Sequence, residues 1–139
     1  MTVEAAHMGV DVGSVSVNIV LVAPDSAIIY ERYVRHKGRP MQQAAAAIRQ
    51  ALEESGVERI LSLATTGSGG KPVADALGGT QVNEVIAQAQ ATGRLLPQAR
   101  TVIEIGGEDS KLMFLKLGSG AAEIADFAMN TMCAAGTGS

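Results

Sequence analysis

The stretch Gly9-Val10-Asp11-Val12-Gly13-Ser14 decides the fold, because an apolar strand ends there on a carboxylate and then turns at a glycine. The apolar residues 8–12 predict a strand that Gly13 ends. Residues 15–22 alternate polar and apolar side chains before becoming wholly apolar, which is typical of a central strand. After a Pro-Asp-Ser turn, residues 27–34 predict a third strand. Short links join these three segments, so the sequence predicts an antiparallel βββ meander.

The rest of the chain predicts alternating helices and strands. An alanine-rich helix is expected over residues 41–55, with Gly56 ending it, and Asn83 is expected to cap a helix that runs to about residue 92. The remaining expected elements are strands over residues 60–64, 101–105, 111–117 and 124–129 and a short helix over residues 72–77. This order predicts an α/β fold, with a mixed sheet that begins with the meander and helices that flank it.

Composition excludes several classes of protein. The chain has 139 residues, enough for one core, and its 47% hydrophobic content excludes disorder. Aromatic residues make up 3% and the formal net charge is −3, which argues against a nucleic-acid surface. The single cysteine cannot form an internal disulfide, no apolar run approaches the roughly 20 residues of a membrane span, and no signal peptide is apparent. We therefore expect a cytoplasmic protein with no nucleic-acid or membrane partner.

A second strand-to-turn segment, Glu104-Ile105-Gly106-Gly107, resembles Asp11-Val12-Gly13-Ser14. In both, a carboxylate near the end of an apolar strand is followed by a glycine. Glycine lets the backbone approach an oxyanion closely, and a nearby carboxylate can hold Mg²⁺ or its waters. Either turn taken alone is also compatible with an ordinary hairpin. Together with the order of the strands, they predict two phosphate-binding turns.

Other phosphate-binding motifs are excluded. The segment 65–72 lacks the Walker pattern, because Thr65 stands where the first glycine belongs and Pro72 follows Lys71. Pro72 also takes the place of the last glycine of a dinucleotide fingerprint. Elsewhere, Lys111 has two interpretations: a residue that assists the second phosphate turn or, more commonly for a hairpin lysine, a solvated side chain. Glu84 is expected to be a favourable charge in the first turn of a helix, and His36 a residue without a ligand role.

The segment Met132-Cys133-Ala134-Ala135-Gly136-Thr137-Gly138-Ser139 joins the only cysteine to a glycine-rich turn. A deprotonated cysteine is a soft metal ligand, although a free cysteine is more often a small buried residue. The turn leaves backbone N–H groups able to bind an anion. Because no residue after Ser139 ends a structural element, we expect the chain to be the first part of a longer protein.

Four motifs occur in order: Gly9–Ser14, Ala64–Gly69, Val102–Lys111 and Met129–Gly138. Together they resemble the activator ATPases of 2-hydroxyacyl-CoA dehydratases, the ATPase subunits of benzoyl-CoA reductases, and the repeat of fused CoA-substrate-specific enzyme activases. These families belong to the actin, sugar-kinase and heat-shock-protein ATPase superfamily. The resemblance covers essentially the whole chain. It implies a ribonuclease-H-like, actin-like ATPase lobe over residues 1–139, with the second, adenosine-binding lobe absent.

The resemblance implies binding of ATP or ADP with Mg²⁺ and a [4Fe–4S] cluster shared by a homodimer of the full-length protein. ATP hydrolysis would drive a low-potential electron to an acyl-CoA dehydratase or reductase. Glu104 would orient the attacking water, Asp11 would hold Mg²⁺ through water, and Cys133 would be a cluster ligand. The residues that would bind the nucleotide or lie beside the cluster are Asp11, Gly13, Ser14, Gly106, Gly107, Gly136, Thr137 and Gly138.

The sequence departs from the family at two positions, because the activators usually carry Asp at the position of Glu104 and Gln at that of Glu108. The longer carboxylate of Glu104 can still reach Mg²⁺ or position a water, with a different geometry. The family's second cluster cysteine and its adenosine-binding half correspond to residues downstream of this chain, so the chain is expected to be inactive by itself. Two alternatives remain open. One is a lobe of an N-acetylglucosamine-type kinase that uses no iron, and the other is a nucleotide-binding assembly module without ATP turnover.

Overall fold

The computed structural model describes residues 4–117 and 122–130. Two compact units make up the chain, Met1–Val82 and Asn83–Ser139. Each unit has its own sheet and its own helical cover, and each is described here by itself.

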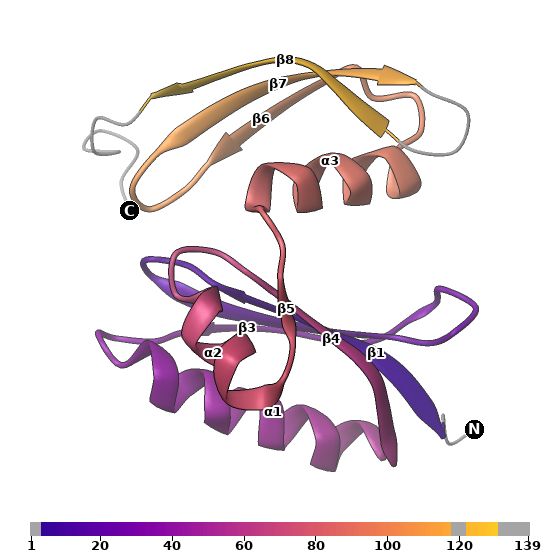
Figure 1. The fold of residues 1–139 in the computed structure, drawn as a ribbon, viewed down its shortest axis with the longest axis vertical. Helices are drawn as coiled ribbons and strands as arrows, with labels where there is room; N and C mark the ends of the chain where they lie inside the picture. Colours follow the sequence, from indigo (N-terminus) through magenta and orange to yellow (C-terminus); the bar gives the residue numbers. More distant parts are fainter. Residues whose placement is uncertain (1–3, 118–121, 131–139) are drawn as a thin grey trace. The chain divides into compact units, whose positions relative to one another are not determined.

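The first unit contains a five-stranded mixed sheet in the order β3-β2-β1-β4-β5 (Figure 1). Its first three strands form the predicted antiparallel meander, which is confirmed. β4 and β5 join the sheet in parallel, β4 beside β1 and β5 beside β4. The two-residue β5 was not predicted, because so short a strand has no periodicity. The bounds are β1 (Ala5–Val12), β2 (Ser16–Val22), β3 (Ile28–Arg35), β4 (Arg59–Thr66) and β5 (Thr80–Gln81).

Two helices, α1 (Pro40–Ser55) and α2 (Gly70–Leu77), cover one face of this sheet (Figure 1). Ala44, Ala47 and Ala51 of α1 are buried against the sheet's apolar side chains, and their small size allows the helix to lie close to the strands. Gly56 ends α1 as predicted, with a left-handed φ of +67° and its N–H donating to the Leu52 carbonyl at 3.2 Å.

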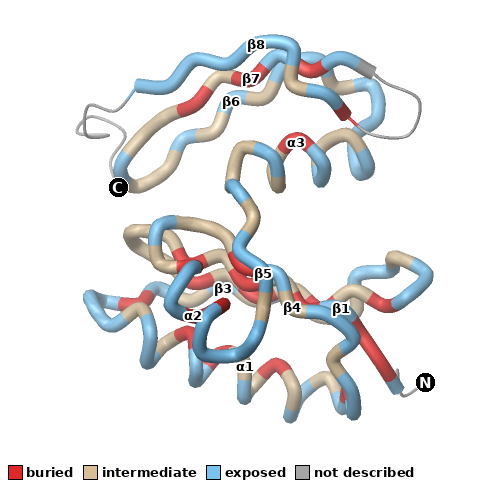
Figure 2. Tube along the Cα trace, in the orientation of Figure 1, coloured by how far each residue is buried: buried red, intermediate tan, exposed pale blue. Residues whose placement is uncertain are grey.

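The second unit packs one helix, α3 (Glu84–Leu95), against a three-stranded antiparallel sheet. The strands are β6 (Thr101–Ile105), β7 (Ser110–Leu117) and β8 (Ala122–Asn130), in that order across the sheet. Ala89 of α3 is buried against Met113 and Leu115. Figure 2 colours the buried positions of α3 and β7 red. The predicted cap is confirmed, because Asn83 Oδ1 accepts the N–H groups of Val85 and Ile86 at 2.9 and 3.4 Å.

The two meanders are built alike. Asp11 of β1 pairs with Asn18 of β2, and Glu104 of β6 pairs with Lys111 of β7. In both hairpins the carboxylate lies two residues before the first glycine of the turn. Both hairpins therefore place a carboxylate just before the turn. They differ in the residue that pairs with this carboxylate across the hairpin, which is Asn18 in the first and Lys111 in the second.

The corresponding apolar residues differ in burial. Val10 and Val12, on the α1 side of the first sheet, are 2% and 0% exposed. Their equivalents, Ile103 and Ile105, are 71% and 63% exposed. We call the outer side of the second sheet the apolar sheet face; by the strand register, it carries Ile103, Ile105, Leu112 and Phe114.

Candidate functional site

The first candidate site lies at the carboxyl ends of β1 and β4. These neighbouring strands are parallel, and Asp11 is in register with Thr66, so the turns that follow both strands lie at the same edge of the sheet. The turn after β4 is bonded to the end of β1, because the Gly69 N–H donates to the Val12 carbonyl at 2.9 Å. Across the hairpin, Asn18 Nδ2 donates to Asp11 Oδ2 at 3.3 Å. This contact holds one carboxylate oxygen of Asp11.

Gly67 brings the second turn close to Asp11. Its φ is +83°, and a Cβ built at this position would lie 2.6 Å from Asp11 Oδ1. Only glycine can hold the backbone so close to the carboxylate in this conformation. The Thr66 hydroxyl beside it is buried and has no hydrogen-bond partner among the residues that the structure describes. This corner therefore offers close backbone, a carboxylate and a buried hydroxyl, which fit a phosphate with its cation.

The His36 side chain holds the first turn by a hydrogen bond to its backbone. It is 7% exposed, and its Nε2 lies 3.1 Å from the Gly13 carbonyl oxygen, while its Nδ1 accepts the Gly38 N–H at 3.2 Å. Since Nδ1 is the acceptor, these partners assign the ring proton to Nε2, which donates to Gly13. Sequence analysis assigned His36 no ligand role and did not predict its contact with the turn, because His36 and Gly13 are 23 positions apart.

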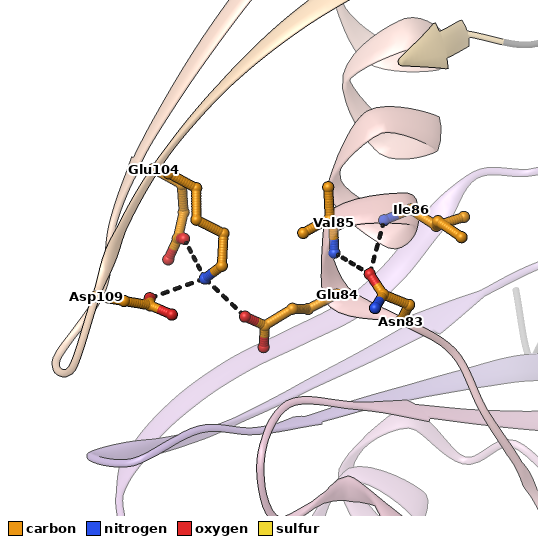
Figure 3. Close-up of polar contacts among 7 residues, drawn as sticks. Asn83, Glu84, Val85, Ile86, Glu104 and Asp109 are labelled. Carbon is orange, nitrogen blue, oxygen red and sulfur yellow. Dashed lines mark hydrogen bonds and ion pairs between the residues drawn. The ribbon is translucent and has the colours of Figure 1, made fainter. Parts of the chain in front are cut away.

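The second candidate site surrounds Lys111, and Figure 3 labels its three carboxylate partners, Glu84, Glu104 and Asp109. Its ammonium lies 2.6 Å from Glu84 Oε1, 2.8 Å from Glu104 Oε2 and 2.8 Å from Asp109 Oδ1. The Lys111 side chain is 4% exposed. The interpretation of Lys111 as a solvated hairpin lysine is therefore wrong, and Glu84 does more than favour the helix terminus. Sequence analysis missed this cluster, because Glu84 reaches it only when α3 packs on the sheet.

The charge of Lys111 is strongly stabilised. Burial by itself would lower its pKa, but hydrogen bonds to Asp109, Glu104 and Glu84 outweigh this effect and raise the pKa above the ordinary value. Lys111 is therefore a cation at neutral pH, with its three N–H donors directed at three carboxylates.

Glu104 is held between this lysine and the glycine turn. Its Oε2 accepts a hydrogen bond from Lys111, and its Oε1 lies 3.0 Å from the position that a Cβ on Gly106 would take. The turn itself is closed by the Gly106 N–H, which donates to the Asp109 carbonyl at 2.8 Å. The proposed water-orienting carboxylate therefore has one oxygen fixed and the other beside the phosphate-type turn.

Four of the predicted site residues are not among those that the structure describes. Cys133, Gly136, Thr137 and Gly138 are outside the described residues. Over residues 4–117 and 122–130, the structure has no group of three or more His, Cys, Asp or Glu side chains that could hold a metal ion. The same part of the chain has no helix long and apolar enough to cross a membrane.

The fold is that of the actin-like ATPases, as the resemblance implied. Residues 8–139 match the model of the BadF/BadG/BcrA/BcrD ATPase family, and the chain belongs to this family. The chain is 35% identical to the activator of lactoyl-CoA dehydratase of Anaerotignum propionicum over 133 residues, which are 94% of this chain and 49% of that protein.

Solved structures of such activators share the fold of this chain. Component A of the Acidaminococcus fermentans (R)-2-hydroxyglutaryl-CoA dehydratase superposes with a TM-score of 0.80 at 25% identity, over 94% of this chain and 49% of that one. The activator of the Clostridium difficile 2-hydroxyisocaproyl-CoA dehydratase, with bound ADPNP, gives a TM-score of 0.77 at 26% identity, over 93% and 47%. The chain spans about half the length of the curated relatives it matches.

Proposed function

We propose that this chain supplies the two phosphate-binding turns of an ATP-hydrolysing activator that acts in the cytoplasm. The activator would pass low-potential electrons to a 2-hydroxyacyl-CoA dehydratase or to an enzyme of the benzoyl-CoA reductase type. Membership of the ATPase family supports the nucleotide, and the names of the relatives support the dehydratase partner. The observation that carries the proposal is the approach of the Gly67 backbone to the Asp11 carboxylate.

Nucleotide chemistry follows from the residues at the two turns. The Gly13 N–H already donates to the Ser16 carbonyl at 2.9 Å, so in this turn the Ser14 backbone amide would bind a phosphate oxygen, and Asp11 would hold Mg²⁺ through water. Gly106 and Gly107 would form the second phosphate turn, where Glu104 would orient the attacking water. Bound Mg²⁺ would neutralise the charge that develops on the transferred phosphoryl group.

The electron-transfer part of the proposal rests on Cys133. Its thiolate would be one ligand of a [4Fe–4S] cluster shared by two subunits, with Gly136, Thr137 and Gly138 forming the loop beside it. When bound, such a cluster supplies one-electron chemistry. The remaining ligands and the adenosine-binding lobe would come from residues that follow this chain in a longer protein.

The first test uses the complete protein, purified without oxygen. We expect Mg²⁺-dependent ATP hydrolysis, and we expect Asp11→Asn to weaken Mg²⁺–nucleotide binding in calorimetry without unfolding the protein. Unchanged affinity in this variant would exclude the role of Asp11. Bound nucleotide without turnover would favour the assembly module instead.

A second test separates the activator from the kinase. Cys133→Ala should lose iron, measured by elemental analysis and visible absorption, and should keep its nucleotide affinity. A normal cluster in that variant would refute the ligand role of Cys133. A wild-type protein that contains no iron and phosphorylates an amino sugar would be a kinase.

A further inference from the structure

We infer that Lys111 is a positioning residue for Glu104, with its ammonium binding one carboxylate oxygen so that the other stays beside the Gly106 turn. This inference rests on the proposed ATP hydrolysis and deepens it, because it names the group that would hold the water-orienting carboxylate in place. Lys111 and its three carboxylate partners all belong to the second unit.

The geometry fixes the ammonium from three directions. Its three partners come from three elements: Glu84 from the first turn of α3, Glu104 from the end of β6, and Asp109 from the β6–β7 turn (Figure 3). An ammonium has three donors, so all are used. A buried cation with three short contacts cannot shift toward one partner without weakening its bonds to the other two. Its position therefore defines that of Glu104 Oε2, 2.8 Å away.

The free oxygen of Glu104 is the one that matters for chemistry. Oε1 lies 3.0 Å from the site of a Cβ on Gly106, so a side chain there would crowd the carboxylate. A glutamate side chain that was not held at Oε2 could rotate about three torsions and would seldom place an oxygen over the turn. Charge-assisted hydrogen bonds with good geometry remove that freedom.

The first hairpin indicates that lysine is not needed for the fold of such a turn. Asn18 occupies the position equivalent to Lys111, and it donates to Asp11 at 3.3 Å, compared with 2.8 Å for the lysine contact. The same strand–turn–strand plan thus forms with a neutral amide across the hairpin. The lysine is a feature of the Glu104 site and not a requirement of the backbone.

The experiment compares three variants of the complete protein. Lys111→Gln removes the charge, Lys111→Arg keeps it, and Lys116→Gln removes an exposed lysine from the same strand as a matched control. Steady-state hydrolysis gives kcat and KM for Mg²⁺–ATP, calorimetry gives the affinity for Mg²⁺–ADP, and thermal unfolding monitors the fold.

We expect Lys111→Gln to lower kcat by about 10- to 100-fold while KM and Mg²⁺–ADP affinity change less than about threefold, since misplacing a reacting group costs rate more than binding. Lys111→Arg should recover part of kcat, and Lys116→Gln should match the wild type. If Lys111→Gln does not fold, Lys111→Arg and Glu84→Gln decide: lowered kcat at an unchanged melting temperature supports the inference, and wild-type kcat in both overturns it.

The outcomes distinguish failure of the positioning role of Lys111 from failure of the proposed ATP hydrolysis. A wild-type protein that neither binds nor hydrolyses ATP overturns both. An active wild type with unchanged kcat in folded Lys111→Gln overturns the positioning role alone. A variant whose kcat and KM worsen together, without rescue by arginine, assigns Lys111 to structure only and also overturns it; a lower melting temperature alone does not, because loss of the buried cation destabilises this unit.

Discussion

The ammonium of Lys111 lies 2.6 Å from the Glu84 carboxylate, which ties the first turn of α3 to the start of β7. Helix and sheet of the second unit are thus joined by charge at one end and by Ala89, Met113 and Leu115 along their length. The same lysine, itself on β7, also binds Glu104 of β6 and Asp109 of the β6–β7 turn. The polar cluster is therefore part of the packing of this unit as well as of its candidate site.

Removing the charge of this cluster should destabilise the second unit. Lys111→Met leaves three carboxylates together without a cation, which costs about 3–5 kcal/mol for fully buried pairs. We expect about 2–4 kcal/mol, because the carboxylates are 25–37% exposed and water screens part of their repulsion. Urea unfolding followed by circular dichroism measures the loss, with Lys116→Met as the exposed control. Equal stabilities of the two variants would contradict the structure.

The stability that Lys111 contributes should depend on pH in one direction. Its pKa is raised in the folded state, so the contribution is complete below the ordinary lysine pKa, about 10.4, and falls as pH rises through the folded-state pKa. The difference in unfolding free energy between wild type and Lys111→Met should therefore be constant from pH 7 to 9 and shrink above pH 10.4. A difference that grows with pH would have the wrong sign.

Gly67 should tolerate no side chain. Gly67→Ala adds a methyl group to a residue at φ +83° whose Cβ would lie 2.6 Å from Asp11 Oδ1. We expect a loss of about 2–4 kcal/mol from backbone strain and the displaced turn, together with weaker nucleotide binding. The control is Gly78→Ala at φ +70°, where nothing lies within 4 Å of the added atom, so only the backbone cost of about 1 kcal/mol applies. Similar losses at both positions would exclude the close approach.

His36 should hold the first turn still. His36→Ala removes the hydrogen bond to the Gly13 carbonyl and leaves a small cavity, at a cost of about 1–3 kcal/mol. Amide hydrogen exchange of residues 13–16 should speed up in this variant and leave exchange in α1 unchanged. His7→Ala is the matched control, because His7 is exposed and contacts Ser62. Unchanged exchange in residues 13–16 would remove His36 from the support of the turn.

Local patterns predicted most of the elements. Short apolar runs, with alternation in residues 15–22, predicted the strands of both meanders. Gly56 marked a helix end because glycine readily adopts a left-handed φ, and Asn83 marked a helix start because its side chain accepts the first N–H groups of the helix. The carboxylate–glycine spacing also located both candidate turns. These features depend on neighbours close in sequence, which a single sequence reveals.

The contacts that build the two candidate sites could not be predicted from the sequence, because they join residues that are far apart in the chain. Hairpin register places Lys111 opposite Glu104, but its contact with Glu84 joins residues 27 positions apart and forms only after α3 docks. The contact of His36 with Gly13 likewise spans the whole meander. Whether a lysine is solvated or buried among carboxylates depends on such docking, and residue spacing carries no signal of it.

The apolar sheet face has a practical consequence for anyone expressing these residues alone. This face leaves the apolar side chains of Ile103, Ile105 and Phe114 exposed to water. Among the described strands, β6 is hydrogen-bonded only to β7, so its other edge is open. An open strand edge next to an exposed apolar surface favours aggregation, because a strand of another molecule can pair with it. Preparations should grow turbid as they are concentrated, and Ile103→Lys should raise the concentration at which they stay clear, without any change to the turns where chemistry is proposed.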